Sequence, residues 1–320
     1  MEKLAHYANF SFEYDLFNSI TPQERMRINS ELDYLFHLWG EESLLAVHEL
    51  LPKDYISKIE ALGFPKIHQT LFNEHSEYKN WVGSLGDIEL ERKLNSKITS
   101  FDLRNKLYPQ PFDQFTFSTS EEFYNRSQKE KTYIIKKPYE MSGRGFRVVK
   151  PGMKLDLKSN GETFIAEEFV EILENISYIR AGKETYIIRH QNTKKFAYSG
   201  SYYYSNPNDV FQKIQGWKAS FKEQLEKVVK AYDLIGAGDY FSIDGYIYKY
   251  ENDLLFNPLG EVNHRKTMGM IGHKIHQRLA SHKDILILFQ PQKLIPENKH
   301  LLLSPPNRHF GLFLCENHNS

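Results

Sequence analysis

Apolar residues recur at helical spacing in three segments of the chain. TPQERMRINSELDYLFHLW, residues 21–39, offers Thr21 as an N-cap and a proline at the first helical position. PKDYISKIEALGF, residues 52–64, keeps its apolar residues on one face until Gly63, which can end a helix. KASFKEQLEKVVKAYDLIGAG, residues 218–238, has the strongest pattern and ends in two glycines. The spacing therefore predicts a helix in each segment.

From about residue 96 to residue 200 the pattern changes to short apolar runs rich in β-branched residues, which is typical of strands. Polar turns at Gly182-Lys183 and Asn192-Thr193 separate antiparallel strands within residues 177–204. Another strand pair is expected over residues 239–263, on either side of the turn YENDL. The earlier runs of this kind are KTYIIKKP (131–138), GRGFRVVKPG (143–152) and ETFIAEEFVE (162–171).

The second strand of that pair changes character in FNPLGEVNHRKTMG, residues 256–269. It places Glu261 and Asn263 at alternate positions, and alternate residues of a strand share one face. A turn centred between residues 252 and 253 would set Asp244, on the preceding strand, directly opposite Glu261. The register therefore predicts two carboxylates and an amide close together.

Two carboxylates opposite each other are unfavourable in a sheet unless positive charge lies between them. Oxygen ligands from two carboxylates and one amide suit magnesium, which usually takes its remaining ligands from water and nucleotide phosphates. Two alternatives remain open at this point. The polar residues could form an ordinary solvated outer face, and a bulge at residues 258–260 could shift the register by one.

Length and composition limit the classes of function. A chain of 320 residues can bury a full core, as two domains or as one domain with a large lobe. Lys plus Arg and Asp plus Glu balance at 41 each, which argues against nucleic acid or an anionic membrane as a partner. A single cysteine, Cys315, excludes an internal disulfide. With no signal-peptide pattern at the start and no run of about 18 apolar residues, we expect a cytoplasmic soluble protein.

A second informative stretch is IIKKPYEMSGRGFRVV, residues 134–149. A lysine at the end of a strand precedes a loop with two glycines and a serine, and another strand follows. Such a loop can cover phosphate, because backbone amides approach it closely where side chains are absent and the lysine adds a charge. A plain glycine hairpin is the alternative. The stretch is neither the dinucleotide fingerprint nor a Walker loop.

Taken in order, four elements resemble the ATP-grasp fold over about residues 100–280. They are the lysine strand with its glycine-rich flap, an acidic hinge strand, a strand with aspartate, and a strand with Glu-x-Asn. The ending EVNHRKTMGM is similar to a poorly characterised branch with a preceding pre-ATP-grasp domain. The resemblance implies an α+β / α/β protein in which two α+β lobes sandwich ATP. The expected parts are a smaller α/β domain over 1–95, a flap and hinge lobe over 96–175, a metal-binding lobe over 176–290, and a C-terminal extension over 291–320.

The resemblance also implies ATP and magnesium as cofactors and assigns residues to them. Metal binding falls to Asp244, Glu261 and Asn263. The flap spacing favours Lys136 over its neighbour Lys137 for the phosphate contact. The remaining nucleotide contacts are assigned to the flap residues Ser142, Gly143, Arg144 and Gly145, to backbone groups of Glu168 and Phe169 for adenine, and to Glu171 for the ribose hydroxyls.

Most ATP-grasp enzymes phosphorylate a carboxylate, and an amine then attacks the acyl phosphate. The resemblance therefore implies a carboxylate–amine ligase acting on small molecules or peptides, in which Lys136, Arg144 and Arg265 are the catalytic cations. Arg180 and Arg189 are candidates for binding a substrate carboxylate, with a surface ion pair as the alternative for each. A kinase on the same fold and a nucleotide-binding regulatory protein remain open. We identify no base in the sequence that would deprotonate a hydroxyl.

The histidines and the cysteine give no prediction of a zinc site or a nucleophile. His264, His273 and His276 are scattered near a helix start without the further ligand that zinc needs. Cys315 has no neighbouring base in the sequence, so a nucleophile role is not expected.

Overall fold

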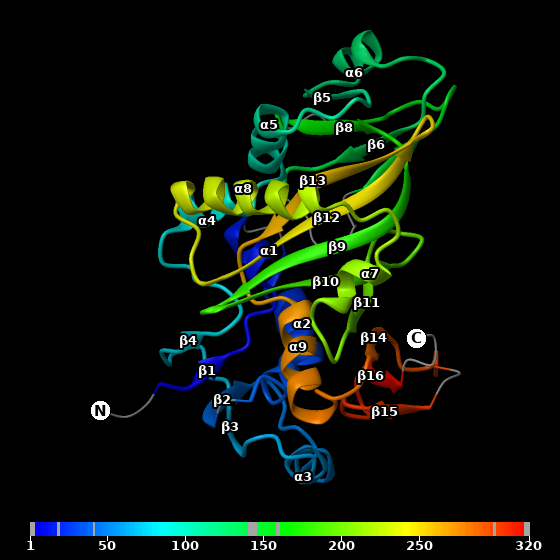
Figure 1. The fold of residues 1–320 in the computed structure, drawn as a ribbon. Helices are drawn as coiled ribbons and strands as arrows, with labels where there is room; N and C mark the ends of the chain where they lie inside the picture. Colours follow the sequence, from blue (N-terminus) through cyan, green and yellow to red (C-terminus); the bar gives the residue numbers. More distant parts are fainter. Residues whose placement is uncertain are drawn as a thin grey trace.

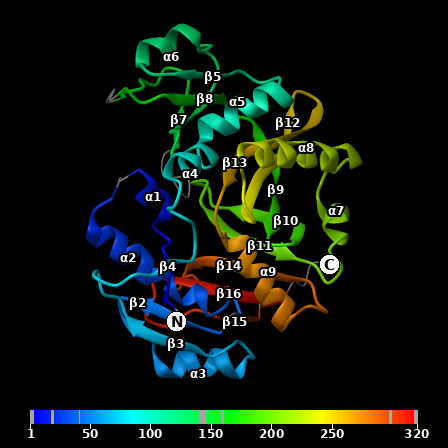
Figure 2. The ribbon, with the colours of Figure 1, turned by 90° about the vertical axis from the view of Figure 1, so that its left-hand side faces the viewer.

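The computed structural model describes residues 4–17, 20–40, 42–139, 146–157, 161–296 and 299–316. Its elements form three sheets (Figure 1). The N-terminal region lies at one end of the molecule and a small lobe at the other, with the largest sheet between them (Figures 1 and 2). Within the described residues, no helix combines the length and the apolar character needed to cross a membrane.

The N-terminal region is a small α/β unit with a parallel sheet in the order β3-β2-β1-β4. The helix expected from Thr21 is present with its capping box, in which Thr21 and Glu24 bond reciprocally. It ends at Leu32 and continues as a 3₁₀ turn. The elements are β1 (His6–Tyr7), α1 (Phe12–Leu16), α2 (Pro22–Leu32), η1 (Asp33–Phe36), β2 (Ser43–Val47), α3 (Lys53–Ala61), β3 (Ile67–Leu71) and β4 (Lys79–Asn80).

Two helices follow in the charged stretch that carried no clear periodicity. They are α4 (Ile88–Leu94) and α5 (Lys97–Leu107), and Ser96 caps the second by accepting from the amide of Ile98. The domain boundary expected after residue 95 lies between these helices and stays a prediction. Helix α5 packs on the strand β13 described below, so it joins the two lobes.

The small lobe is an antiparallel sheet in the order β5-β8-β6-β7. Its outer face carries the aromatic core around Phe115, Phe123 and Tyr133, which helix α6 covers. The strand patterns of KTYIIKKP, GRGFRVVKPG and ETFIAEEFVE predicted three of its members correctly. Its elements are β5 (Gln114–Phe117), α6 (Ser120–Arg126), β6 (Tyr133–Lys136), β7 (Arg147–Val149) and β8 (Phe164–Glu168).

The largest sheet is antiparallel in the order β13-β12-β9-β10-β11-β14-β16-β15. Helix α8 covers the face of this sheet on which Phe241 and Ile243 of β12 lie. The helix ends at Gly236, whose φ of 110° lies in the left-handed region. Helix α9 packs on the opposite face, where Gly269 lies against Ile179. The elements are β9 (Glu171–Ala181), β10 (Glu184–Asn192), β11 (Tyr198–Tyr203), α7 (Asp209–Lys213), α8 (Ala219–Ile235), β12 (Tyr240–Tyr250), β13 (Asp253–Asn263), α9 (Met268–Leu279), β14 (Ile285–Pro291), β15 (His300–Leu302) and β16 (Phe310–Glu316).

Two of the expected domain boundaries do not follow the structure. The boundary after residue 175 falls inside β9, and the boundary after residue 290 falls inside β14. Residues 291–316 continue the largest sheet through β16 and β15, so they are not a separate extension. One apolar cluster runs from the N-terminal region through α9 to β16 and explains why these parts are not independent.

Candidate active site

Strands β12 and β13 place Asp244 directly opposite Glu261, as the register predicted. The turn lies one residue earlier than expected, because Tyr250 pairs with Asp253. A register shift then occurs between Asp244 and Tyr246, where β13 carries two extra residues. The two departures compensate, so the carboxylate pairing is confirmed although its expected geometry was wrong.

The two carboxylates lie in a site where positive charge is favoured. Burial raises the pKa of both Asp244 and Glu261. Lys97, at the start of α5, places Nζ 2.9 Å from Glu261 Oε1 and opposes that rise. Lys97 also donates its backbone N–H to the carbonyl of Pro138, just after β6. Its charge therefore belongs to the site, although no periodic signal in the sequence pointed to it.

Asn263 completes the predicted metal set. Its Nδ2 donates to Asp244 Oδ2 at 3.0 Å, and its Oδ1 accepts from Arg265 Nη2 at 3.1 Å. No group of three or more His, Cys, Asp or Glu side chains gathers for a metal in the described ranges. The donor set is instead two carboxylates with one amide, which suits a hard cation that keeps several water or phosphate ligands. The residues present therefore fit magnesium.

The N-terminal region holds the segment that follows Asn263. Arg265 Nε donates to Glu13 Oε1 of α1 at 2.6 Å. Lys266 donates Nζ to the carbonyl of Trp81 at 2.7 Å, and it lies over the rings of Trp81, Trp39 and Tyr240. Because Arg265 and Lys266 are adjacent, this cage fixes the backbone that carries the guanidinium. The position of Arg265 thus depends on residues far away in the sequence.

A line of hydrogen bonds runs from Asp244 in the other direction across the sheet. Ser177 of β9 donates Oγ to Asp244 Oδ1 at 2.6 Å, and His190 Nδ1 of β10 lies 2.9 Å from the same Oγ. The serine lies between the acid and the imidazole, so this is not the Ser-His-Asp order of a hydrolase triad. Burial lowers the pKa of His190 to about 4. Neither Ser177 nor His190 was predicted from the sequence.

A second group of buried charges lies between the small lobe and α5. Glu167 of β8 binds Lys136 Nζ at 2.5 Å through Oε2 and Arg104 Nη2 at 2.6 Å through Oε1. Burial alone would raise the pKa of Glu167, but the two cations outweigh it and lower the pKa to about 2. Arg104 also donates to the carbonyl of Leu259 on β13, so it ties the two lobes together. Arg104 was missed by sequence analysis.

The choice between the adjacent lysines follows from the strand faces. Lys136 lies on the face of β6 that carries Glu167, opposite the aromatic core of the small lobe. Lys137 follows the strand and points away from that face by alternation. The geometry therefore favours Lys136 as the lysine that faces the largest sheet.

The amides of the predicted hinge have partners within the protein. Those of Glu168 and Phe169 donate to the carbonyls of Asp113 and Thr132, and an adenine contact through backbone groups of these two residues stays a prediction. The Glu168 carboxylate binds Lys131 at 2.9 Å. Glu171 is exposed at the start of β9, where a ribose contact stays a prediction.

The flap lies outside the described residues. Ser142, Gly143, Arg144 and Gly145 fall in the undescribed range 140–145, so their phosphate contacts stay predictions.

The two arginines assigned to a substrate carboxylate lie on the wrong face of the sheet. Arg180 pairs in register with Phe241 on the face that α8 covers, and it binds Asp233 of α8 at 2.6 Å. Arg189 pairs with Glu174 at 3.0 Å on the same face. The ion-pair alternative explains both residues, and we do not carry their substrate role further.

The remaining candidates have structural partners. His264 binds Glu91 through Nδ1 at 2.7 Å and accepts the amide of Gly238 through Nε2. His273 stacks on Tyr186 at 3.9 Å between ring centroids. Burial raises the pKa of Cys315 to about 11, which disfavours a thiolate.

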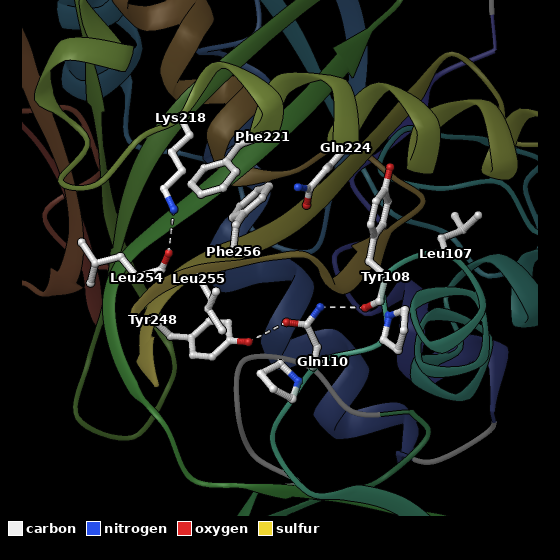
Figure 3. A pocket seen from close by; sticks show the side chains of 12 residues that line it. Leu107, Tyr108, Gln110, Lys218, Phe221, Gln224, Tyr248, Leu254, Leu255 and Phe256 are labelled. Atoms are coloured by element: carbon white, nitrogen blue, oxygen red, sulfur yellow. Dashed lines mark hydrogen bonds between the residues drawn. The ribbon is translucent and has the colours of Figure 1, made fainter. Parts of the chain in front are cut away.

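A hollow of about 320 Å³ lies elsewhere, between α8, the β12–β13 hairpin and the segment joining α5 to β5 (Figure 3). Tyr248 donates to Gln110, which in turn donates to the carbonyl of Tyr108, and Lys218 donates to the carbonyl of Leu254. The side chains of the carboxylate site do not line this hollow. It is therefore separate from the candidate active site.

No family model and no curated protein matches the sequence. Solved structures, however, share the fold. N5-carboxyaminoimidazole ribonucleotide synthetase in its ADP complex has a TM-score of 0.53 at 11% identity, over 90% of each chain. The enzyme of that name from Thermus thermophilus has a TM-score of 0.52 at 12% identity, over 90% of this chain and 92% of its own. N5-carboxyaminoimidazole synthetase from Staphylococcus aureus, complexed with ADP, has a TM-score of 0.51 at 12% identity, over 100% and 95%.

These likenesses define the class of structure. The chain has the ATP-grasp fold, and the fold expected from the order of its four elements is confirmed. At this level of identity the comparisons establish the fold alone.

Proposed function

We propose that the protein is an ATP-dependent ligase that joins a carboxylate to an amine through an acyl phosphate and releases ADP and phosphate. One observation carries the proposal. The Asp244 and Glu261 carboxylates face each other across neighbouring strands, and the ammonium group of Lys97 forms an ion pair with the carboxylate of Glu261. This arrangement suits phosphoryl transfer, whose catalysis consists mainly of positioning and charge neutralisation.

Each cation has a distinct place in this reaction. Lys97 and Lys136 approach from α5 and β6, where they would neutralise nucleotide phosphates. Lys136 would then exchange part of its contact with Glu167 for phosphate. Arg265, oriented by Glu13 and Asn263, would donate to the oxygens of the acyl phosphate.

Asp244, Glu261 and Asn263 are the residues that would hold magnesium. When bound, the metal supplies positive charge to the phosphate oxygens. Partial burial of both carboxylates supports this assignment, since a cation offsets the cost of removing part of the water around the two charges.

Small-molecule or peptide acids and amines are the proposed substrates. The structures with the same fold are described as synthetases, and two of them are ADP complexes, which supports a nucleotide-dependent ligation. The balance of charged residues supports neither nucleic acid nor a membrane as the partner.

The direct test is ADP release by the purified protein with magnesium, ATP and a panel of amino acids and amines, with products identified by mass spectrometry. Glu261→Gln should lower turnover at least 100-fold, because it removes a metal charge. Asp233→Asn is the matched control, since this exposed carboxylate only pairs with Arg180 on the opposite face. If Glu261→Gln kept full turnover, the metal assignment would be wrong.

A kinase on the same fold remains the second candidate, and one observation favours it. The ring of His190 is linked to Asp244 through the hydroxyl of Ser177, and a hydroxyl substrate could donate a hydrogen bond to this ring. The same mass spectra distinguish the two, since a kinase yields a phosphorylated product and a ligase yields a condensed one.

A further inference from the structure

His190 is a polar side chain of the site that the proposed chemistry leaves without a role. It lies on β10, two strands away from Asp244, on the face that carries the carboxylates. Its ring is partly buried and is linked to Asp244 through Ser177.

The hydrogen bonds fix the tautomer of this ring. The hydroxyl of Ser177 has one proton, and it donates that proton to Asp244 Oδ1 at 2.6 Å. The contact of 2.9 Å between Ser177 Oγ and His190 Nδ1 therefore requires Nδ1 to be the donor. A neutral imidazole protonated on Nδ1 carries a lone pair on Nε2. Nε2 has no hydrogen-bond partner among the described residues.

The ring stays neutral at neutral pH, because burial lowers the pKa of His190 to about 4. A neutral acceptor does not suit phosphate or carboxylate, whose ionised oxygens are also acceptors. It suits a group with a proton to donate. The two carboxylates are instead flanked by cations, Lys97 and Arg265, which suit the anionic oxygens of phosphate.

We propose that Nε2 of His190 accepts the N–H hydrogen bond of the attacking amine and so orients its lone pair toward the acyl phosphate. This inference rests on the proposed ligase function and names the position of the nucleophile within it. Asp244 and Ser177 act as positioning residues for the ring, so a metal ligand and the nucleophile site share one hydrogen-bond chain.

One arm of the test needs no substrate. In ¹⁵N-labelled full-length protein, the side-chain nitrogens of His190, assigned by their loss in His190→Asn, should show a protonated Nδ1 and a lone-pair Nε2 at pH 7. Ser177→Ala should shift this tautomer balance. An Nε2-protonated or fully charged ring in the wild type would overturn the inference, whatever the outcome of the activity panel.

The second arm uses hydroxylamine as the nucleophile, with the acid that supports ADP release in the panel. His190→Asn keeps a donor near the Nδ1 position and removes the acceptor at Nε2. It should lower kcat/KM for hydroxylamine roughly 10- to 100-fold, because the nucleophile's donor is left unpaired. The KM for ATP should stay within about twofold. His190→Gln, which places an amide oxygen near Nε2, should recover most of the loss.

The outcomes separate the two proposals. A wild type that releases no ADP with any acid contradicts the ligase function, while the tautomer measurement still tests His190. Unchanged kcat/KM for hydroxylamine in His190→Asn overturns the inference and leaves the ligase function standing. A raised KM for ATP instead would assign His190 to the ribose hydroxyls and would also overturn it. If His190→Asn does not fold, Ser177→Ala tests the positioning of the ring instead: it removes the contact with Nδ1, so kcat/KM for hydroxylamine should fall, and an unchanged value would overturn the inference.

Discussion

Replacing Glu167 with glutamine removes the carboxylate that holds Arg104 and Lys136 between the two lobes. All three side chains are at most 10% exposed. The pKa of Glu167 falls from an ordinary value of 4.5 to about 2. One pKa unit corresponds to about 1.4 kcal/mol, so the ionised carboxylate contributes about 3 kcal/mol to the free energy of unfolding at pH 7. Breaking a buried ion pair by removing one partner typically has a cost of this size.

The pH dependence of this contribution has a definite sign. Because the folded state lowers the pKa, the contribution is fully present above about pH 4.5 and is lost as the pH falls toward 2. Urea unfolding followed by circular dichroism should therefore give the same difference between wild type and Glu167→Gln at pH 7 and pH 5. Asp233→Asn, at an exposed ion pair, should change the free energy of unfolding by less than about 1 kcal/mol. A loss below about 1 kcal/mol in Glu167→Gln, or a loss that grows from pH 7 to pH 5, would refute this reasoning.

Three further substitutions, with Lys137→Met as the control for the first, test the cations of the site. Lys136→Met should raise the KM for ATP at least tenfold or abolish turnover, whereas Lys137→Met should leave both nearly unchanged, and the reverse result would move the phosphate contact to Lys137. Lys97→Met should raise the KM for magnesium-ATP, because Glu261 loses a partner and the site loses a charge; unchanged steady-state kinetics would exclude Lys97 from the site. Lys266→Met should lower kcat several-fold with little effect on the KM for ATP, because the ring cage would no longer fix Arg265, and a selective rise in that KM would contradict this role.

The elements themselves were largely readable from local pattern. The helix Ala219–Ile235 repeats its apolar residues on one face and ends at a left-handed glycine, and both features are properties of the local chain. The strand assignments of β6, β8, β12 and β13 followed in the same way. Helices α4 and α5 were missed, because their buried positions carry few apolar residues. The stripe that α5 buries against β13 includes Lys97, Ser100 and Arg104, so it shows no apolar periodicity.

The residues of the site also divide into those that local pattern could predict and those that it could not. Glu261 and Asn263 could be grouped because two residues of one strand share a face, and Asp244 could be added because a short hairpin fixes which residues meet. Lys97 meets Glu261 across 164 residues of sequence, and no local signal predicts such a contact.

By itself the sequence determined many of the helices and strands, the alternation of polar residues in the proposed metal set, and a resemblance to the ATP-grasp fold, since each of these depends on residues close together in the chain. The tertiary structure decided which faces meet. It turned Arg180 and Arg189 away from the carboxylates, and it joined Ser177 and His190 to Asp244 across three strands. The physical reason is that hydrogen bonds and charge pairs act through space over a few ångströms, and only the packed sheets bring distant residues within that range.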